Sequence, residues 1–234
     1  MPTYLYCVIP AGYEPPAATA VGVERAPVRA LSSDELDAWV STVPDASIPG
    51  TLANARAHDG VVRAAMSRAT PVPARLGQVV AHDDDLRRWM RERQRALIQS
   101  SERVRGCVEM TVRVLMSGGD PAAGVRQGGE PPRDSGRAYL DWLRARQQAL
   151  RDAERQARRL HEEIARLTSG VIRETAGVSV HAVAPLLEVA HLVPRDLIAR
   201  HRDIVHAVVE GRWGLRLMLT GPWAPYTFCT AASE

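Results

Sequence analysis

A long helical repeat between residues 136 and 175 limits what this chain can fold into more than any other feature. Large apolar residues return there at alternating intervals of three and four positions over about four heptads, the spacing of a coiled-coil seam. The large members of this apolar stripe are Tyr139, Leu143, Leu150, Leu160, Ile164 and Leu167, with Ala153 and Ala157 between them and Arg146 as the one interruption. A helix with such a stripe needs a surface that covers it.

Two interpretations of the stripe stay open. In the first, it packs on the chain's own sheet or on a partner helix. Alanine at two seam positions and arginine at a third favour this interpretation, because they weaken a self-standing coiled coil. In the second, the stripe is an exposed association surface.

The elements around this helix predict a ferredoxin-like domain. Alternating or continuous apolar runs indicate strands at 107–115, 177–184, 187–193 and 214–220, and a second helix fits 194–210. The resulting order, strand-helix-strand-strand-helix-strand, is that of the split βαβ unit. Residues 117–135 are rich in glycine and proline and are expected to form a loop.

The first half of the chain predicts a second small α+β domain. We expect strands at 4–9 and 28–31, a helix at 51–69, a bent or edge strand at 72–80 and a helix from 86 to about 105. Residues 36–43 fit helix and strand spacing equally well. The predicted organisation is therefore α+β with domains at 1–105 and 106–220, followed by a tail at 221–234.

The tail opens with an unusual box, Gly221–Phe228, which holds two prolines, a glycine and three different aromatic residues. Its prolines exclude a helix interior or a central strand. We expect a stiff, extended segment whose rings dock on the chain's own domains or, alternatively, contact a partner. The candidate residues for either role are Trp223, Pro225, Tyr226 and Phe228.

Composition and charge exclude several classes of protein. The chain has 234 residues, a formal charge of +3 and no lysine, and its arginines alternate with acidic residues as on a solvated helix face rather than in a nucleic-acid groove. The three cysteines are far apart and predict no disulfide framework. We find no signal peptide and no apolar run of about 18 residues that could cross a bilayer, so we expect a cytoplasmic protein without nucleic-acid or lipid partners.

The sequence predicts no catalytic site, cofactor or metal. The histidines do not form a metal-binding pair on one helix, and the paired glycines lack the lysine of a phosphate loop. The acidic triplet Asp83–Asp85 is interpreted as a helix cap rather than a metal site. A cysteine–histidine dyad could form only in three dimensions, and none of the cysteines has an activating context.

Short motifs in a fixed order make the chain resemble the gas vesicle protein family GvpF/GvpL. They are Tyr4–Tyr6, His58–Arg63, Thr70–Gly77, Gly106–Met110, Gly136–Leu140, Ala190–Pro194 and Gly221–Phe228. The last is the most specific, since it is similar to the family's Gly-Pro-Trp-Pro-Pro-Tyr-x-Phe ending. Several family aromatics are replaced, for example by Leu76, Met110 and His191.

The resemblance implies an accessory or minor structural protein of gas vesicles that binds the small hydrophobic shell protein, and possible further accessory proteins, during vesicle nucleation or assembly. It also implies that residues 36–43 form a strand, and it brings no catalytic residues or cofactor. The alternative is a ferredoxin-like ligand-binding or regulatory module unrelated to vesicles, because this fold hosts many functions.

Overall fold

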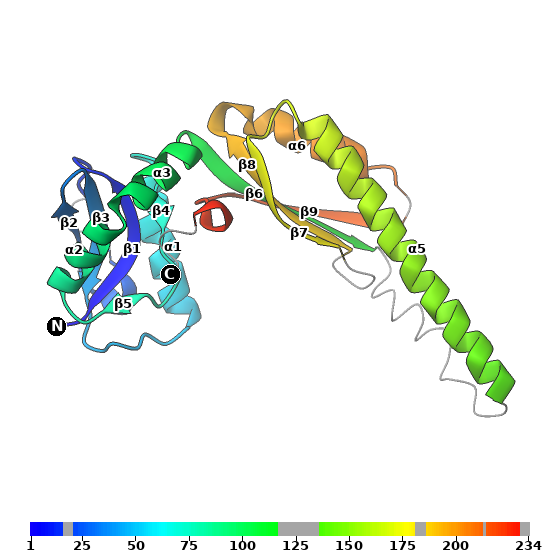
Figure 1. Cartoon of the computed structure of the whole chain (residues 1–234), viewed down its shortest axis with the longest axis horizontal. Helices are drawn as coiled ribbons and strands as arrows, with labels where there is room; N and C mark the ends of the chain where they lie inside the picture. Colours follow the sequence, from blue (N-terminus) through cyan, green and yellow to red (C-terminus); the bar gives the residue numbers. More distant parts are fainter. Residues whose placement is uncertain (16–20, 117–135, 181–185, 213, 230–234) are drawn as a thin grey trace. The chain divides into compact units, whose positions relative to one another are not determined.

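The computed structural model describes residues 1–15, 21–116, 136–180, 186–212 and 214–229. It divides into two compact units: unit 1 comprises Met1–Glu109 and Pro222–Glu234, and unit 2 comprises Met110–Gly221. The predicted loop at 117–135 and residues 181–184 of the strand predicted at 177–184 lie outside the described residues. Each unit combines helices with a sheet (Figure 1), so the α+β class is confirmed.

Unit 1 is built on a sheet whose strands run in the order β2-β3-β1-β4, with β5 also paired to β1. Its strands and helices are, in chain order, β1 (Thr3–Pro10), η1 (Val23–Arg25), β2 (Val28–Ser33), β3 (Leu36–Thr42), α1 (Leu52–Met66), β4 (Val72–Pro73), β5 (Val79–Val80), α2 (Asp83–Glu92), α3 (Gln94–Val104) and η3 (Tyr226–Phe228). Residues 36–42 thus form a strand, as the resemblance implied.

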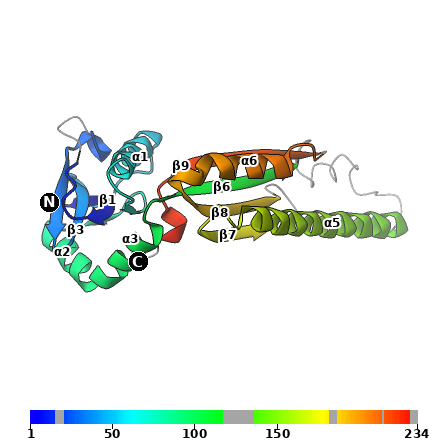
Figure 2. The same ribbon diagram turned by 90° about the horizontal axis from the view of Figure 1, so that it is seen from above.

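The central strand β1 explains why unit 1 has helices on both sides of its sheet. Residues Tyr4–Ile9 are all at most 1% exposed, and successive side chains of a strand point to opposite faces. Both faces of β1 must therefore be covered. Figure 2 shows α1 on one side of the sheet and α2 with α3 on the other.

Two predictions for unit 1 need correction or refinement. The predicted single helix from 86 to about 105 is two helices, because the backbone at Arg93 leaves helical geometry (φ −105°, ψ 9°) and each helix buries its own apolar residues. The predicted strand at 72–80 is two short strands, β4 and β5, that both pair antiparallel with β1. Proline at position 73 removes a backbone donor, which agrees with the expected bend.

Unit 2 contains a four-stranded sheet in the order β7-β8-β6-β9. Its elements are, in chain order, β6 (Cys107–Met116), α5 (Gly136–Thr168), β7 (Glu174–Val180), β8 (Leu187–Pro194), η2 (Arg195–Leu197), α6 (Ile198–Val209) and β9 (Leu215–Trp223). The first residues of β6 and the last two of β9 belong to unit 1. The core is aliphatic and joins β6, α5, β8 and α6, with side chains of β9 packed against it.

The long helix is shorter than predicted, since it ends at Thr168 instead of near residue 175. Gly170 lies two positions further on, and glycine is common just after the end of a helix. The next strand begins earlier than predicted, at Glu174, and its pairing with β8 shifts between Ala176 and Ser179. Gly177 lies in that shift at φ +59°, a left-handed conformation that suits glycine.

Among the described residues, no helix is both long enough and apolar enough to cross a membrane.

Candidate functional site

The C-terminal box, Gly221–Phe228, leaves the edge strand β9 and ends in the short helix η3 within unit 1. Its two prolines fit this path, because proline is tolerated in an edge strand and outside regular structure. Ala224, Pro225 and Phe228 are buried, whereas Trp223 and Tyr226 are half-buried. The box is therefore partly an internal segment of unit 1 and partly surface.

A buried carboxylate connects the box to unit 1. Glu109, on β6, is 7% exposed and accepts two hydrogen bonds, from the Thr227 backbone N–H and from the Thr227 hydroxyl, each 2.8 Å long. Burial raises the pKa of Glu109, and the two bonds from Thr227 act in the opposite direction. Arg103 adds a weaker bond to the Phe228 carbonyl oxygen at 3.4 Å. The box is thus anchored by polar contacts as well as by its rings.

The two half-buried rings of the box face α1. The Arg63 guanidinium carbon lies 4.9 Å from the centroid of the Trp223 ring, which is cation–π geometry. The Tyr226 ring lies 6.5 Å from the ring of His58. Both α1 residues are in the His58–Arg63 segment of the sequence, so two motifs that are distant along the chain meet here.

His58 links the box to the central strand. Its Nδ1 lies 2.8 Å from the hydroxyl of Tyr4, and its ring lies 5.6 Å from that of Tyr6. Burial lowers the pKa of His58 to about 4. The imidazole is therefore neutral at physiological pH, which suits a structural hydrogen bond in an aromatic cluster better than proton transfer near neutrality.

The apolar stripe of α5 divides into a covered part and an exposed part. Leu160 and Ile164 are fully buried, Leu143 and Leu150 are half-buried, and Tyr139 is 43% exposed. Figures 1 and 2 both show the N-terminal half of α5 extending past the sheet of unit 2. The stripe is therefore covered by the sheet at its C-terminal end and accessible toward its N-terminal end, and an association role for the accessible end stays a prediction.

One stripe residue is placed differently from the expected seam. Leu167 is 40% exposed, and Thr168 is buried in its place with its hydroxyl donating to the Ile164 carbonyl oxygen at 2.7 Å. A straight helix has 3.6 residues per turn, so a strict three-four repeat drifts off the covered face. The last two buried residues of this face, Ile164 and Thr168, are consequently four positions apart instead of three.

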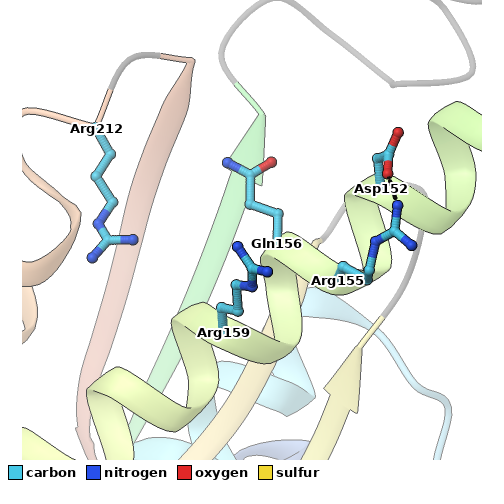
Figure 3. Close-up of a pocket in the computed structure, with 5 residues that line it drawn as sticks. All are labelled: Asp152, Arg155, Gln156, Arg159 and Arg212. Atoms are coloured by element: carbon cyan, nitrogen blue, oxygen red, sulfur yellow. Dashed lines mark hydrogen bonds and ion pairs between the residues drawn. The ribbon is translucent and has the colours of Figure 1, made fainter.

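An open groove of about 610 Å³ in unit 2 is lined by charged and amide side chains (Figure 3). Its lining residues are Asp152, Arg155, Gln156 and Arg159 of α5, together with Arg212 between α6 and β9. The sequence analysis did not single out these residues, because alternating charges on a long helix usually mark a solvated face. Arg212 is far from the other lining residues along the chain, and its pairing with Glu163 of α5, 49 positions away, is a tertiary contact.

Two histidines form a buried pair in unit 2. His191 of β8 and His201 of α6 are both 0% exposed, and their Nδ1 and Nε2 atoms lie 2.8 Å apart. Burial lowers the pKa of His191 to about 3 and that of His201 to about 4. Sequence spacing did not reveal this pair, which forms only through the packing of α6 on β8.

The described residues contain no cluster of three or more metal-ligating side chains. Each aspartate of the acidic triplet is instead paired with an arginine: Asp83 with Arg29, Asp84 with Arg87 and Asp85 with Arg88. All three cysteines are buried, and burial raises the pKa of the Cys7 and Cys229 thiols. Raised thiol pKa values disfavour the nucleophilic thiolate.

Comparison with known proteins gives consistent matches over nearly the whole chain. The model of the family described as "Gas vesicle synthesis protein GvpL/GvpF" matches residues 2–230. Gas vesicle protein L from Streptomyces sp. (strain CB03234) is 32% identical over 229 residues, which cover 93% of this chain and 79% of the relative.

Two crystal structures of GvpF have a similar fold. The protein from Anabaena sp. PCC7120 aligns with a TM-score of 0.79 at 17% identity, over 97% of this chain and 95% of its own. The protein from Microcystis aeruginosa aligns with a TM-score of 0.74 at 16% identity, over 97% and 98%. At these identities the two structures support the fold alone.

Proposed function

Because the chain belongs to the GvpL/GvpF family of gas vesicle synthesis proteins, we propose that it is an accessory or minor structural protein that binds the small hydrophobic shell protein and assists vesicle nucleation or assembly. The observation that carries the proposal is the family match over residues 2–230. We further propose that the protein is non-catalytic, acts in the cytoplasm and associates with the gas vesicle, with other accessory proteins as possible additional partners.

The chemistry of a shell subunit supports this role. A small hydrophobic protein that polymerises into a wall exposes apolar surface before it is incorporated, and a partner must offer apolar or edge-strand surface to hold it. This chain offers both kinds. The strands β2 and β7 each lie at an edge of a sheet, and the N-terminal half of α5 exposes large apolar side chains.

We assign the exposed part of the apolar stripe as the first candidate contact surface. Tyr139 is 43% exposed, the neighbouring Leu140 is 51% exposed, and Leu143 is half-buried. The Tyr139 ring stacks on that of Trp142 at 6.1 Å between centroids, which keeps the aromatic surface of this segment together. In the box, Trp223 and Tyr226 are the second candidates, because both stay partly exposed.

We also infer that residues 106–220 form a ferredoxin-like domain and that the tail at 221–234 serves mainly to complete unit 1. The order of elements β6-α5-β7-β8-α6-β9 and the strand order β7-β8-β6-β9 support the first inference. The contacts of Trp223, Tyr226 and Thr227 with unit 1 support the second.

Complementation of a deletion strain that carries no second copy of the family tests the proposed function. The wild-type chain should restore vesicles, and Tyr139→Ser should restore fewer. Leu167→Ser is the matched control, since it removes an equally exposed apolar side chain from the other end of the same helix. Normal vesicles in the uncomplemented deletion strain would contradict the role in assembly, and equal effects of the two variants would contradict the assigned surface.

A further inference from the structure

The groove of unit 2 is lined by charged and amide side chains, which the binding of a hydrophobic shell protein does not require. Four of its lining residues lie on two turns of α5, and Arg212 lies across from them in the turn between α6 and β9 (Figure 3). In this view the side chains of Gln156, Arg159 and Arg212 extend toward the same space, while Asp152 and Arg155 pair with each other at one end. Donor groups from two separate elements therefore converge.

The groove carries an uncompensated positive charge. Arg155 forms an ion pair with Asp152, and Arg212 forms one with Glu163 of α5. The side chain of Arg159 makes no ion pair or hydrogen bond with any other residue in the part of the chain that the structure describes, and the same holds for the amide of Gln156. A guanidinium and an amide are thus both available to an acceptor.

Arg212 is held in place before any ligand binds. Its Nε donates to the Val208 carbonyl oxygen at 2.6 Å, and its Nη2 donates to Glu163. A guanidinium has five N–H groups, so others stay free to face the groove. Because the Arg212 side chain is already ordered, it loses less conformational entropy when a ligand binds there.

We propose that this groove binds an acidic segment of a partner protein, with one carboxylate placed between Arg159 and Arg212 and a further hydrogen bond from the Gln156 amide. Guanidinium groups bind carboxylates with charge-assisted, often bidentate, hydrogen bonds. The lining residues 152–159 span about 10 Å along the helix, which matches about three residues of an extended peptide.

The same observations argue against nucleic acid as the occupant. Asp152 lines the groove and Glu163 lies beside it, so a continuous phosphate backbone would meet negative charge at both ends. A peptide can place its acidic side chains at intervals and avoid these carboxylates. The proposal is independent of the role in gas vesicles, since it rests on the groove alone.

The test measures binding of a short fluorescein-labelled peptide of alternating glutamate and serine to the full-length chain by fluorescence anisotropy at low ionic strength. The matched pair of variants is Arg159→Gln and Arg158→Gln. Both remove one exposed arginine from adjacent positions of α5, but Arg158 does not line the groove. Thermal unfolding of both variants serves as the control for folding. Both variants should keep the fold, because both side chains are exposed.

We expect Arg159→Gln to weaken peptide binding about fivefold, the upper range for one exposed ion pair, and Arg158→Gln to change it less than about twofold. A peptide with glutamine in place of glutamate should not bind. Equal losses in the two variants, or binding of the glutamine peptide, would overturn the proposal. Inorganic phosphate that displaces the peptide at equal or lower concentration would also overturn it, because the groove would then be a site for free oxyanions.

Discussion

The two units of this molecule are stabilised in different ways. In unit 1, buried polar groups connect segments that are far apart along the chain, as in the bond from Thr227 to Glu109 and the bond between Tyr4 and His58. In unit 2, the core is a set of aliphatic side chains from one continuous stretch, with the His191–His201 pair as a buried polar contact. The difference shows that apolar sequence patterns suffice to predict the core of unit 2, whereas unit 1 also depends on specific tertiary contacts.

The comparison also predicts which substitutions destabilise only one of the two units. Unit 1 includes residues from the end of the chain, so a change in the box should loosen unit 1. A change in the covered part of α5 should loosen unit 2. Hydrogen exchange followed by mass spectrometry reports on both units in one experiment, because protection of each segment reflects its own opening free energy.

Among the single substitutions, the largest effect is expected for Phe228→Ala. Phe228 is 1% exposed within unit 1, and removal of a buried phenyl ring leaves a cavity that costs about 3–5 kcal/mol. Amide protection should fall in β1, β3 and α1. Loss of protection mainly in β7 and β8 would show that the box does not belong to unit 1.

The mirror experiment is Leu160→Ala in unit 2. Leu160 is fully buried in the aliphatic core, so its truncation should cost about 2–5 kcal/mol. Leu167→Ala on the same helix is the control and should destabilise the unit much less, since Leu167 is 40% exposed. Equal destabilisation by both variants in urea unfolding would contradict the placement of the stripe.

Acid should affect unit 2 more than unit 1. The pKa values of His191 and His201 are lowered to about 3 and about 4, so between these values and 6.5 the unfolded state binds protons that the folded state does not. Stability is therefore lost as the pH falls below 6.5, at up to about 1.4 kcal/mol per pH unit for each histidine.

In unit 1, His58 acts in the same direction, with its pKa lowered to about 4. Burial raises the pKa of Glu109, however, and a carboxyl group of this kind adds stability as the pH falls. Urea unfolding between pH 7 and pH 4.5, combined with hydrogen exchange, compares the units. His191→Leu with His201→Leu should flatten the acid response of unit 2, and an unchanged slope would contradict the role of the pair.

The smallest effect is expected for Trp223→Ala. The ring is half-buried and stacks on Arg63, so its loss should cost about 1–2 kcal/mol of unit 1 stability and lower the melting temperature. Arg63→Gln removes the same cation–π contact without removing the ring and should cost less. If Trp223→Ala leaves melting unchanged but abolishes binding of the shell protein, the ring is a partner contact instead of an anchor.

The order of strands and helices could be predicted because it depends on local patterns. The alternation of Val108, Met110, Val112 and Val114 indicated β6, and proline and glycine marked many element boundaries. The break at Arg93 could not be predicted, since no glycine or proline marks it and each helix packs on different neighbours.

The contacts of the candidate site could be predicted only in part. The box was singled out by its composition, and Glu109 lies in a motif that the resemblance identified. Their bond joins residues 118 positions apart, so it depends on the tertiary fold. The same is true of the His191–His201 pair and of Arg212 opposite α5, because these side chains meet only when separate elements pack.

Direct binding to the shell subunit is the measurement that tests the account most directly. The tagged full-length chain is co-expressed with the gas vesicle shell subunit from the same organism, captured through its tag, and the bound subunit is quantified against a tag-only control. The account predicts that the shell subunit is retained and that Tyr139→Ser retains less of it than Leu167→Ser. Recovery of the subunit at the level of the tag-only control would contradict the proposed function.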